Sequence, residues 1–298
     1  MDIRQLRYLV ALARERHFAR AAEACGVAQP TLSAGLRNLE DELGVPVVER
    51  GNRFKGLTPE GERVLAWAQR ILADCDALEQ ELIEARRSLK GRVAIGVIPS
   101  ALTMVADLTT ALLARQPGIG LKLLSMSSIE IQRGLDSFEL HAGVTYLDNE
   151  PLTRVRALPL YRERYVLLVR RGQGLDGRSG IGWAEAAGQR LCLLVPEMQN
   201  RRIIDAAFAR AGARPSPVVE TDSMVALVSH VREAGLAAIV PEHFLPRLAA
   251  EEGLVSLRLE APEVVHTVGL VVAERDPIPP VVAALWAAAQ TIAQMVGA

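Results

Sequence analysis

The sequence predicts an α/β chain in which a helical N-terminal part, with a winged helix-turn-helix and a long helix, precedes a larger region of strands and helices. Two observations support this fold class. Residues 1–90 read as helices with one short irregular interruption, whereas apolar strand-like runs alternate with amphipathic stretches after Gly91. In addition, 50% of the 298 residues are hydrophobic and 4% are aromatic, which is typical of a folded α/β protein. A chain of this length fits two or three domains.

Composition excludes several other classes of protein. The three cysteines, Cys25, Cys75 and Cys192, lie far apart without a CxxC motif, so we expect reduced, apolar, buried thiols. The N-terminal residues carry charges throughout, which argues against a signal peptide. No apolar run reaches the roughly 18 residues that a membrane helix needs. We therefore expect a cytoplasmic protein with no membrane partner.

A helix-turn-helix is predicted at about residues 18–37. The alanine-rich stretch Phe18–Cys25 predicts a short helix that ends at Gly26, and a second helix begins at Gln29. Small side chains at positions 21 and 22 let the two helices cross closely. In the second helix, apolar residues recur at steps of four, three and four and predict one buried stripe, made of Leu32, Leu36, Leu39 and Leu43.

The opposite face of the second helix carries short hydrogen-bonding groups and one guanidinium, at Gln29, Thr31, Ser33 and Arg37. Such groups suit base edges and phosphates in a DNA major groove, although an ordinary helical hairpin remains the alternative. After Gly44-Val45-Pro46, the stretch Val47–Leu57 predicts a hairpin with Gly51-Asn52 at its turn. This wing carries basic residues that could hold phosphates: Arg50, Arg53 and Lys55.

The segment from Leu6 to Leu65 resembles the N-terminal domain of LysR-type transcriptional regulators. The motifs AA, QPTLS, LE-x-ELG-x-P, ER and LTPEG carry the resemblance and occur in the family's order. It implies a double-stranded DNA partner, contacted by Gln29, Pro30, Thr31, Ser33 and Arg37 on the recognition helix and by Arg50 and Arg53 in the wing.

Two residues depart from the family pattern. Ala28 replaces the usual Ser or Thr at the N-cap of the recognition helix, which costs about 1 kcal/mol of helix stability. Gly35 stands inside that helix and costs about 1 kcal/mol relative to Ala. Residues 1–57 hold nine basic and seven acidic side chains, so we expect DNA binding to depend on a dimer that engages two half-sites.

Thr58-Pro59 predicts the start of a long helix, with a hydroxyl N-cap and proline at the first helical position. Apolar residues then follow steps of four and three, which predicts a dimer seam made of Val64, Ala68, Ile71, Cys75, Leu78, Leu82 and Leu89. Packing of this face onto its own domain is the alternative. The family resemblance favours a linker helix through which a homodimer, and from it a tetramer, assembles.

The region after Gly91 predicts parallel sheets built from βαβ units. Expected strands are Val93–Ile98, Gly120–Met126, Tyr165–Val169, Leu191–Val195, Leu236–Pro241 and Val264–Val272. Expected helices are Ala101–Arg115, Ile129–Asp136, Arg201–Ala211 and Ser223–Glu233.

Residues 91–298 resemble the effector domain of the same family, which is similar to periplasmic solute-binding proteins. The resemblance rests on GRVAIGVIPS, on Pro-Leu-Tyr at 159–161 and on the strand–helix rhythm, while LHAGV matches its family motif only in part. It implies a domain plan of 1–58 for the winged helix-turn-helix, 59–90 for the linker helix and 91–298 for a two-lobed effector domain. Lobe I would hold about 91–160 and 266–298, and lobe II about 161–265. The chain would cross between them near Leu158–Arg164 and Val264–Val268.

Ligands of open α/β sheets bind where strands end and helices begin. We therefore expect the effector site at Ser100, Ser127, Ser128, Met198, Gln199 and Thr221, which follow predicted strands. Helix starts bind small anions, and Arg201 and Arg202 could neutralise one, so a small anionic metabolite is expected. Helix capping alone is the alternative for each serine.

Neither GxSxG, Walker A, GxGxxG after a strand nor HExxH occurs, and the five histidines are scattered. We expect no enzyme, no metal and no cofactor. The predicted function is a sequence-specific DNA-binding transcriptional regulator controlled by a small-molecule effector, with RNA polymerase as a further partner. A cytoplasmic solute-binding sensor without a direct DNA-binding role is the alternative, against which the wing argues.

Overall fold

The computed structural model describes residues 1–49, 54–84, 89, 91–245 and 253–296, with the side chains of 80–84 and 295–296 left outside this description. The chain forms two compact units, Met1–Arg87 and Ser88–Ala298, and each is described by itself. None of the helices described is both long enough and apolar enough to cross a membrane.

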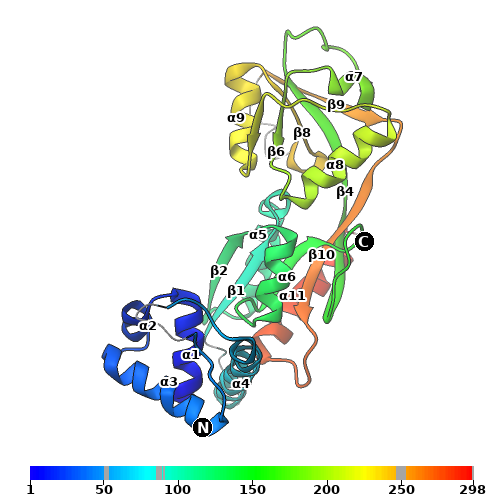
Figure 1. Ribbon diagram of the computed structural model, residues 1–298. Coiled ribbons are helices and arrows are strands. Elements are labelled where there is room, and N and C mark those ends of the chain that lie inside the picture. The colour runs from blue at the N-terminus through cyan, green and yellow to red at the C-terminus, as the bar shows by residue number, and fades with distance from the viewer. Residues whose placement is uncertain (50–53, 85–88, 90, 246–252, 297–298) are drawn as a thin grey trace. The chain divides into compact units, whose positions relative to one another are not determined.

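The first unit is a helical domain built on the predicted helix-turn-helix (Figure 1). Its helices are α1 (Ile3–Glu15), α2 (Phe18–Ala24), α3 (Gln29–Leu43) and α4 (Pro59–Glu84). Leu32, Leu36 and Leu39 of α3 are buried in its core, as predicted. The prediction is wrong for Leu43, which is 37% exposed because it ends the helix where the chain turns away at Gly44. An antiparallel bridge between Val48 and Leu57 forms the base of the predicted wing.

Two glycines let the elements of this unit approach one another. A Cβ on Gly35 would lie 2.7 Å from two ring atoms of Tyr8, so the mid-helix glycine makes room for the α1 ring against α3. A Cβ on Gly61 would lie 2.0 Å from the carbonyl oxygen of Val47, so α4 can approach the wing only with glycine there. Close packing therefore accounts for both residues, including one that lowers helix propensity.

Part of the predicted dimer seam on α4 is used within the chain. Ala68 is fully buried in the core of the first unit, and Val64 and Ile71 pack against that core. Leu89 is buried in the core of the second unit. The seam prediction is therefore wrong for Ala68 and Leu89, because neither has surface left for a partner.

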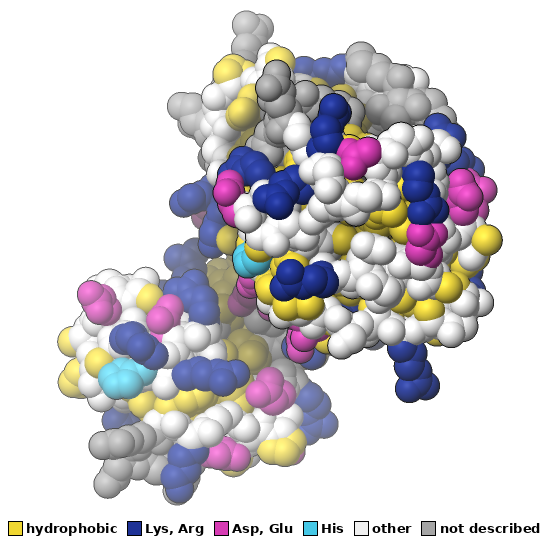
Figure 2. Space-filling model, turned by 90° about the horizontal axis from the view of Figure 1, so that it is seen from above, with side chains coloured by type: hydrophobic (Ala, Val, Ile, Leu, Met, Phe, Trp, Pro, Cys, Tyr) yellow, Lys and Arg dark blue, Asp and Glu magenta, His cyan; other side chains and the backbone are white. Residues whose placement is uncertain are grey.

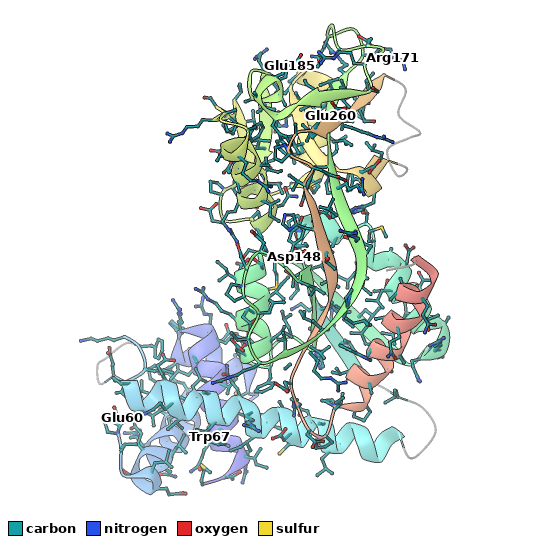
Figure 3. All side chains as sticks on the ribbon, turned by 90° about the vertical axis from the view of Figure 1, so that its right-hand side faces the viewer. Glu60, Trp67, Asp148, Arg171, Glu185 and Glu260 are labelled. Carbon is teal, nitrogen blue, oxygen red and sulfur yellow. The ribbon has the colours of Figure 1, made fainter. Side chains whose placement is uncertain are left out.

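The rest of α4 presents a different face. Leu78, a predicted seam residue, is 58% exposed, and Trp67, which the heptad pattern did not include, is 64% exposed (Figure 3). Cys75 is half-buried. The side chain of Leu82 lies outside the described residues.

The second unit is a mixed sheet covered by helices. Its strands are β1 (Gly91–Val97), β2 (Ile119–Ser125), β3 (Ala142–Tyr146), β4 (Val155–Arg170), β5 (Gly180–Gly182), β6 (Leu191–Leu194), β7 (Val219–Thr221), β8 (Ala237–Pro241), β9 (Leu254–Glu260) and β10 (Val265–Ala273). The described strands run in the order β2-β1-β3-β10-β4-β8-β6-β7, with β9 pairing β4 and β5. The helices are α5 (Val105–Arg115), α6 (Ser128–Asp136), α7 (Trp183–Ala187), α8 (Gln199–Arg210), α9 (Met224–Ala234) and α11 (Pro280–Val296), and two short 3-10 turns are Pro99–Ala101 and Glu242–Phe244.

Two long antiparallel strands divide this unit into two lobes (Figure 1). Residues 155–164 of β4 pair with β10, and residues 165–170 pair with β8 and β9. Lobe I holds β1–β3, α5, α6 and α11, and lobe II holds β5–β9 and α7–α9. The two-lobed architecture and both predicted crossings are confirmed.

Several elements differ from the sequence prediction. The helix expected from Ala101 begins at Val105, because a 3-10 turn at Pro99–Ala101 precedes it. The strands β3, β5, β7 and β9 and the helices α7 and α11 were not predicted. The short strands β5 and β7 have three residues each, which is too few for an alternating pattern to be recognised.

Candidate DNA-binding face and effector cleft

The polar face predicted on α3 is accessible. Gln29, Pro30, Thr31 and Arg37 are exposed and Ser33 is half-exposed, on the side of the helix opposite the buried leucines. The guanidinium of Arg37 donates to the carbonyl oxygen of Ser33 across 3.3 Å. The helix starts at Ala28 without a side-chain cap, as predicted, so the backbone N–H groups of its first turn carry their partial positive charge without a side-chain acceptor.

Glu40 joins this helix to the wing. One carboxylate oxygen accepts hydrogen bonds from the backbone N–H of Val47, across 2.7 Å, and of Val48, across 2.9 Å. Thr58 completes the joint, because its hydroxyl donates to the carbonyl oxygen of Pro46 across 2.6 Å and caps α4. The sequence analysis missed the role of Glu40, although a carboxylate seven residues before a wing is a signal that could have suggested it.

Charge on the first unit is mixed. In the face of the molecule that Figure 2 shows, Lys and Arg side chains lie among Asp and Glu rather than in one continuous patch. Lys55 is exposed, while Arg50 and Arg53 lie outside the described residues. The predicted contacts of those two arginines with phosphate stay predictions.

In the second unit, the hydroxyl of Tyr146 joins side chains from both lobes and from β4. It donates to Oε1 of Glu163 on β4. Tyr165 donates to the Tyr146 oxygen across 3.1 Å, Asn200 donates through Nδ2 across 3.2 Å, and Oγ of Ser100 lies 3.2 Å away. We call these five residues the Tyr146 hub.

Glu163 is the buried charge of the hub. Its side chain is fully buried, and burial raises the pKa of its carboxyl to about 7, although the hydrogen bonds from Tyr146, Tyr165 and Ser100 act in the opposite direction. Burial, together with the charge of Glu163, also raises the pKa of Tyr146 well above its ordinary value. Tyr146 therefore remains a protonated hydroxyl that can donate to the carboxylate.

The start of α8 in lobe II contacts lobe I directly. Arg202 donates through Nε to Glu150 across 2.7 Å, and its Nη2 lies 3.4 Å from Oγ of Ser128. Ser128 in turn donates to the same Glu150 carboxylate across 3.0 Å. These bonds connect the first turn of α8 with the start of α6 and with the loop after β3.

Asp148 ties that loop to the crossing strand β10 (Figure 3). One oxygen lies 2.8 Å from Nδ1 of His266, and the other accepts the backbone N–H of Thr267 across 2.9 Å. Its backbone carbonyl accepts Nε2 of Gln199 across 3.4 Å. The loop after β3 is therefore held by β10 and by α8 together.

The structure brings three of the six predicted effector residues to this region between the lobes: Ser100, Ser128 and Gln199. Ser127 instead caps α6 and exchanges hydrogen bonds with Glu130, and Thr221 accepts the backbone N–H of Ser223. Met198 takes the N-cap position of α8 and packs against a core of lobe II.

The sequence analysis missed the centre of the region: Tyr146, Glu163, Tyr165, Asn200 and Asp148. In YRERYVLLV, Glu163 alternates with Tyr161 and Tyr165 on one face of the strand, and this spacing is the signal that could have indicated a buried carboxylate.

The comparison with protein families decides what this architecture belongs to. Residues 3–62 match the bacterial regulatory helix-turn-helix protein, lysR family, and residues 86–294 match the LysR substrate binding domain. The chain belongs to the LysR family. It is a DNA-binding transcriptional regulator with an effector-binding domain, as predicted.

Other members of the LysR family resemble it along most of its length. It is 29% identical over 279 residues to the DNA-binding transcriptional dual regulator OxyR of Escherichia coli strain K12, which covers 93% of this chain and 91% of that protein. It is 35% identical over 177 residues, 59% of this chain and 93% of that protein, to a probable hydrogen peroxide-inducible genes activator of Mycobacterium xenopi.

Solved structures of full-length regulators have the same fold as this chain. A substituted full-length OxyR from Pseudomonas aeruginosa superposes with a TM-score of 0.79 at 26% identity, covering 99% of this chain and 97% of that one. The LysR-family regulator CbnR shares the fold, with a TM-score of 0.67 at 22% identity over 98% of this chain and 99% of that one.

Proposed function

We propose that this LysR-family regulator reads a double-stranded operator with the exposed face of α3, through Gln29, Pro30, Thr31, Ser33 and Arg37, with Arg50 and Arg53 of the wing on adjacent phosphates. The observation that carries the proposal is the accessibility of this polar face opposite three buried leucines. Short polar groups and a guanidinium at the start of a helix are the groups that contact base edges in the major groove.

The test measures fluorescence anisotropy of the full chain with a labelled duplex from upstream of its own gene and with a random duplex. Arg37→Ala should weaken binding to the specific duplex roughly 10- to 100-fold, since one base contact contributes about 1–3 kcal/mol. Arg178→Ala is the matched control, because it removes an exposed guanidinium of the other unit, which pairs with Glu185. Equal losses in both variants would contradict the proposed role of α3.

We further propose that a small-molecule effector binds between the lobes, at Ser100, Ser128, Gln199 and the Tyr146 hub, and changes the affinity for DNA. Support comes from the contacts of α8 with lobe I, because a ligand placed there would change how the lobes meet. The same proposal includes three further points. The protein acts in the cytoplasm, it is a regulator rather than an enzyme, and RNA polymerase is one of its partners.

Relatives of this chain are named as hydrogen peroxide-inducible genes activators. Its own cysteines argue for reversible binding rather than thiol oxidation at the site between the lobes. Cys25 and Cys75 belong to the first unit. Cys192 is fully buried in β6, and burial raises its thiol pKa to about 11, which leaves little reactive thiolate. Hydrogen peroxide should therefore not change DNA affinity through Cys192, so its effect should be the same in wild type and in Cys192→Ala. A change that Cys192→Ala abolishes would contradict this proposal.

We propose that the homodimer forms through the face of α4 that carries Trp67 and Leu78, with pairs of dimers as the route to a tetramer. Trp67 and Leu78 lie about three helical turns apart on one face of α4, and two large exposed apolar side chains on one helix face favour an interface. Leu78→Glu should convert dimers to monomers in sedimentation velocity. Val225→Glu, which changes an apolar residue of α9 that is 73% exposed, is the control and should leave the dimer intact. Dimers that survive Leu78→Glu would place the interface elsewhere.

A further inference from the structure

One oxygen of the buried Glu163 carboxylate has no hydrogen-bond partner among the described residues. Oε1 accepts from Tyr146, but Oε2 accepts from no donor. The ring of His243 faces this oxygen, but its Nδ1 lies 3.9 Å from Oε2, beyond hydrogen-bond distance. An unsatisfied carboxylate oxygen at a fully buried position is costly, and a bound water, ion or ligand group is one way in which native proteins satisfy such an atom.

Gln199 carries a second buried acceptor of the same kind. Its side chain is 2% exposed, and Oε1 has no partner among the described residues. The amide orientation is set by Asp148, because a backbone carbonyl accepts only from Nε2. Asn200, the next residue of α8, donates to the Tyr146 hydroxyl, so Gln199 and Glu163 belong to one region.

The cations beside this region are already neutralised. Arg202 pairs with Glu150 at 2.6 Å. Arg201 is 7% exposed and pairs with Asp205 at 2.9 Å and with Glu220 at 2.5 Å. Arg201 and Arg202, which the sequence analysis expected to bind an anion, are therefore paired with carboxylates of the chain. The side-chain oxygens of Glu163 and Gln199 remain unsatisfied.

We propose that the effector presents hydrogen-bond donors, from an ammonium or a hydroxyl group, to Oε2 of Glu163 and Oε1 of Gln199, and that this site selects against a free carboxylate. This inference rests on the proposed effector site between the lobes. It replaces the small anion expected from helix starts alone, because Arg201 and Arg202 are already paired with carboxylates, whereas the unsatisfied oxygens of Glu163 and Gln199 are acceptors.

The substitution Glu163→Gln distinguishes a ligand that donates a hydrogen bond to this position from a ligand that accepts one. The amide of Gln keeps an oxygen that can accept from Tyr146, and it places an NH₂ group where Oε2 had been. A ligand that donates to Oε2 then meets another donor and loses its bond, whereas a ligand that accepts gains one. The substitution also removes a buried charge without changing the size of the side chain, so the hub can still form.

The experiment follows thermal unfolding of the full chain at pH 8 and constant ionic strength with three probes: methylammonium chloride, ethylene glycol and sodium acetate. Methylammonium or ethylene glycol should raise the unfolding midpoint of the wild type by roughly 2–4 °C and should not raise that of Glu163→Gln. Stabilisation by methylammonium identifies an ammonium, and stabilisation by ethylene glycol identifies a hydroxyl. Glu185→Gln, an exposed carboxylate of lobe II paired with Arg178, should respond as the wild type does.

Stabilisation of the wild type by acetate, equal shifts in wild type and Glu163→Gln, or no shift with any probe would overturn the proposal. The last result would mean that a water molecule satisfies Oε2. If Glu163→Gln does not fold, Gln199→Met serves as the second variant and should also lose the shift. DNA binding of the unliganded variant is measured in parallel: retained binding with no probe effect rejects this inference alone, and a wild type that binds no DNA rejects the proposed function.

Discussion

On α3, Gln29, Thr31 and Arg37 project from a helix whose other face is buried, and their hydrogen-bonding groups are accessible. In the Tyr146 hub, hydroxyl and amide groups are also present, together with a carboxyl group, but they are buried and bonded to one another. Exposed polar groups can be changed at little cost to folding, whereas buried ones couple ligand recognition to stability. The two sites should therefore respond differently to substitution, and this contrast can be tested.

The largest loss of stability is expected where α4 packs against the wing, at Gly61. Gly61→Ala should lower the stability of the first unit by about 3 kcal/mol, because the new Cβ would meet a backbone carbonyl oxygen that cannot rotate away. Urea unfolding followed by circular dichroism measures the loss. Gly182→Ala is the control, since a Cβ there meets no atom within 4 Å. A neutral Gly61→Ala would show that α4 and the wing separate easily.

Removing the central hydroxyl tests the buried site. Tyr146→Phe should destabilise the second unit by about 2 kcal/mol, because Glu163 would lose its donor and Asn200 its acceptor. Chemical denaturation gives the change in free energy of unfolding, with the half-buried Tyr8→Phe of the first unit as a comparison. If the two variants lose equal stability, the hub contributes nothing beyond an ordinary tyrosine.

The pH dependence sharpens the contrast further. Because the pKa of Glu163 is raised to about 7 in the folded chain, the native state holds a proton that the unfolded state releases near 4.5. Its contribution to the stability of the second unit should be fully present below about pH 4.5 and lost as the pH rises through about 7. Thermal midpoints between pH 5 and 8 should fall less in Glu163→Gln than in wild type. Parallel profiles would contradict the raised pKa.

The smallest expected effect is a gain in the stability of the first unit. Ala28→Ser should stabilise the first unit by about 1 kcal/mol, because a hydroxyl at the N-cap can accept a free backbone N–H of α3. Thermal unfolding shows the gain as a higher midpoint. Ala34→Ser, inside the same helix, should show no gain; a similar rise there would mean that capping is not the cause.

Local patterns predicted what depends on local spacing. The Leu32, Leu36 and Leu39 steps of α3, the break at Gly26 and the Thr58-Pro59 helix start each lie within a few residues, and the structure has these three features. The crossings were predicted from the family resemblance instead, because Leu158–Arg164 contains no long apolar run. Gly35 shows the limit of local patterns. Its cost to helix stability could be predicted from the sequence, but the Tyr8 ring that requires a glycine there lies on another helix.

The hub could not be predicted because its five members come from four separate segments. Tyr146 and Glu163 are 17 residues apart, and Tyr146 and Asn200 are 54 residues apart. Only the fold of two lobes around β4 brings them together. The dimer-seam prediction failed for a different reason. Ala68 has the heptad spacing, but this spacing does not distinguish a helix that packs on another chain from one that packs on its own domain.

The carboxylate of Glu40 has a consequence for target selection. Because one oxygen holds two successive amides at the base of the wing, helix and wing cannot tilt independently. In the proposed complex, with α3 in the groove and the wing on the adjacent phosphates, the distance between these two contacts would therefore be fixed. Duplexes whose groove is narrower or wider than this span must deform to fit, so the stiffness of a sequence enters its recognition even at bases that no side chain touches.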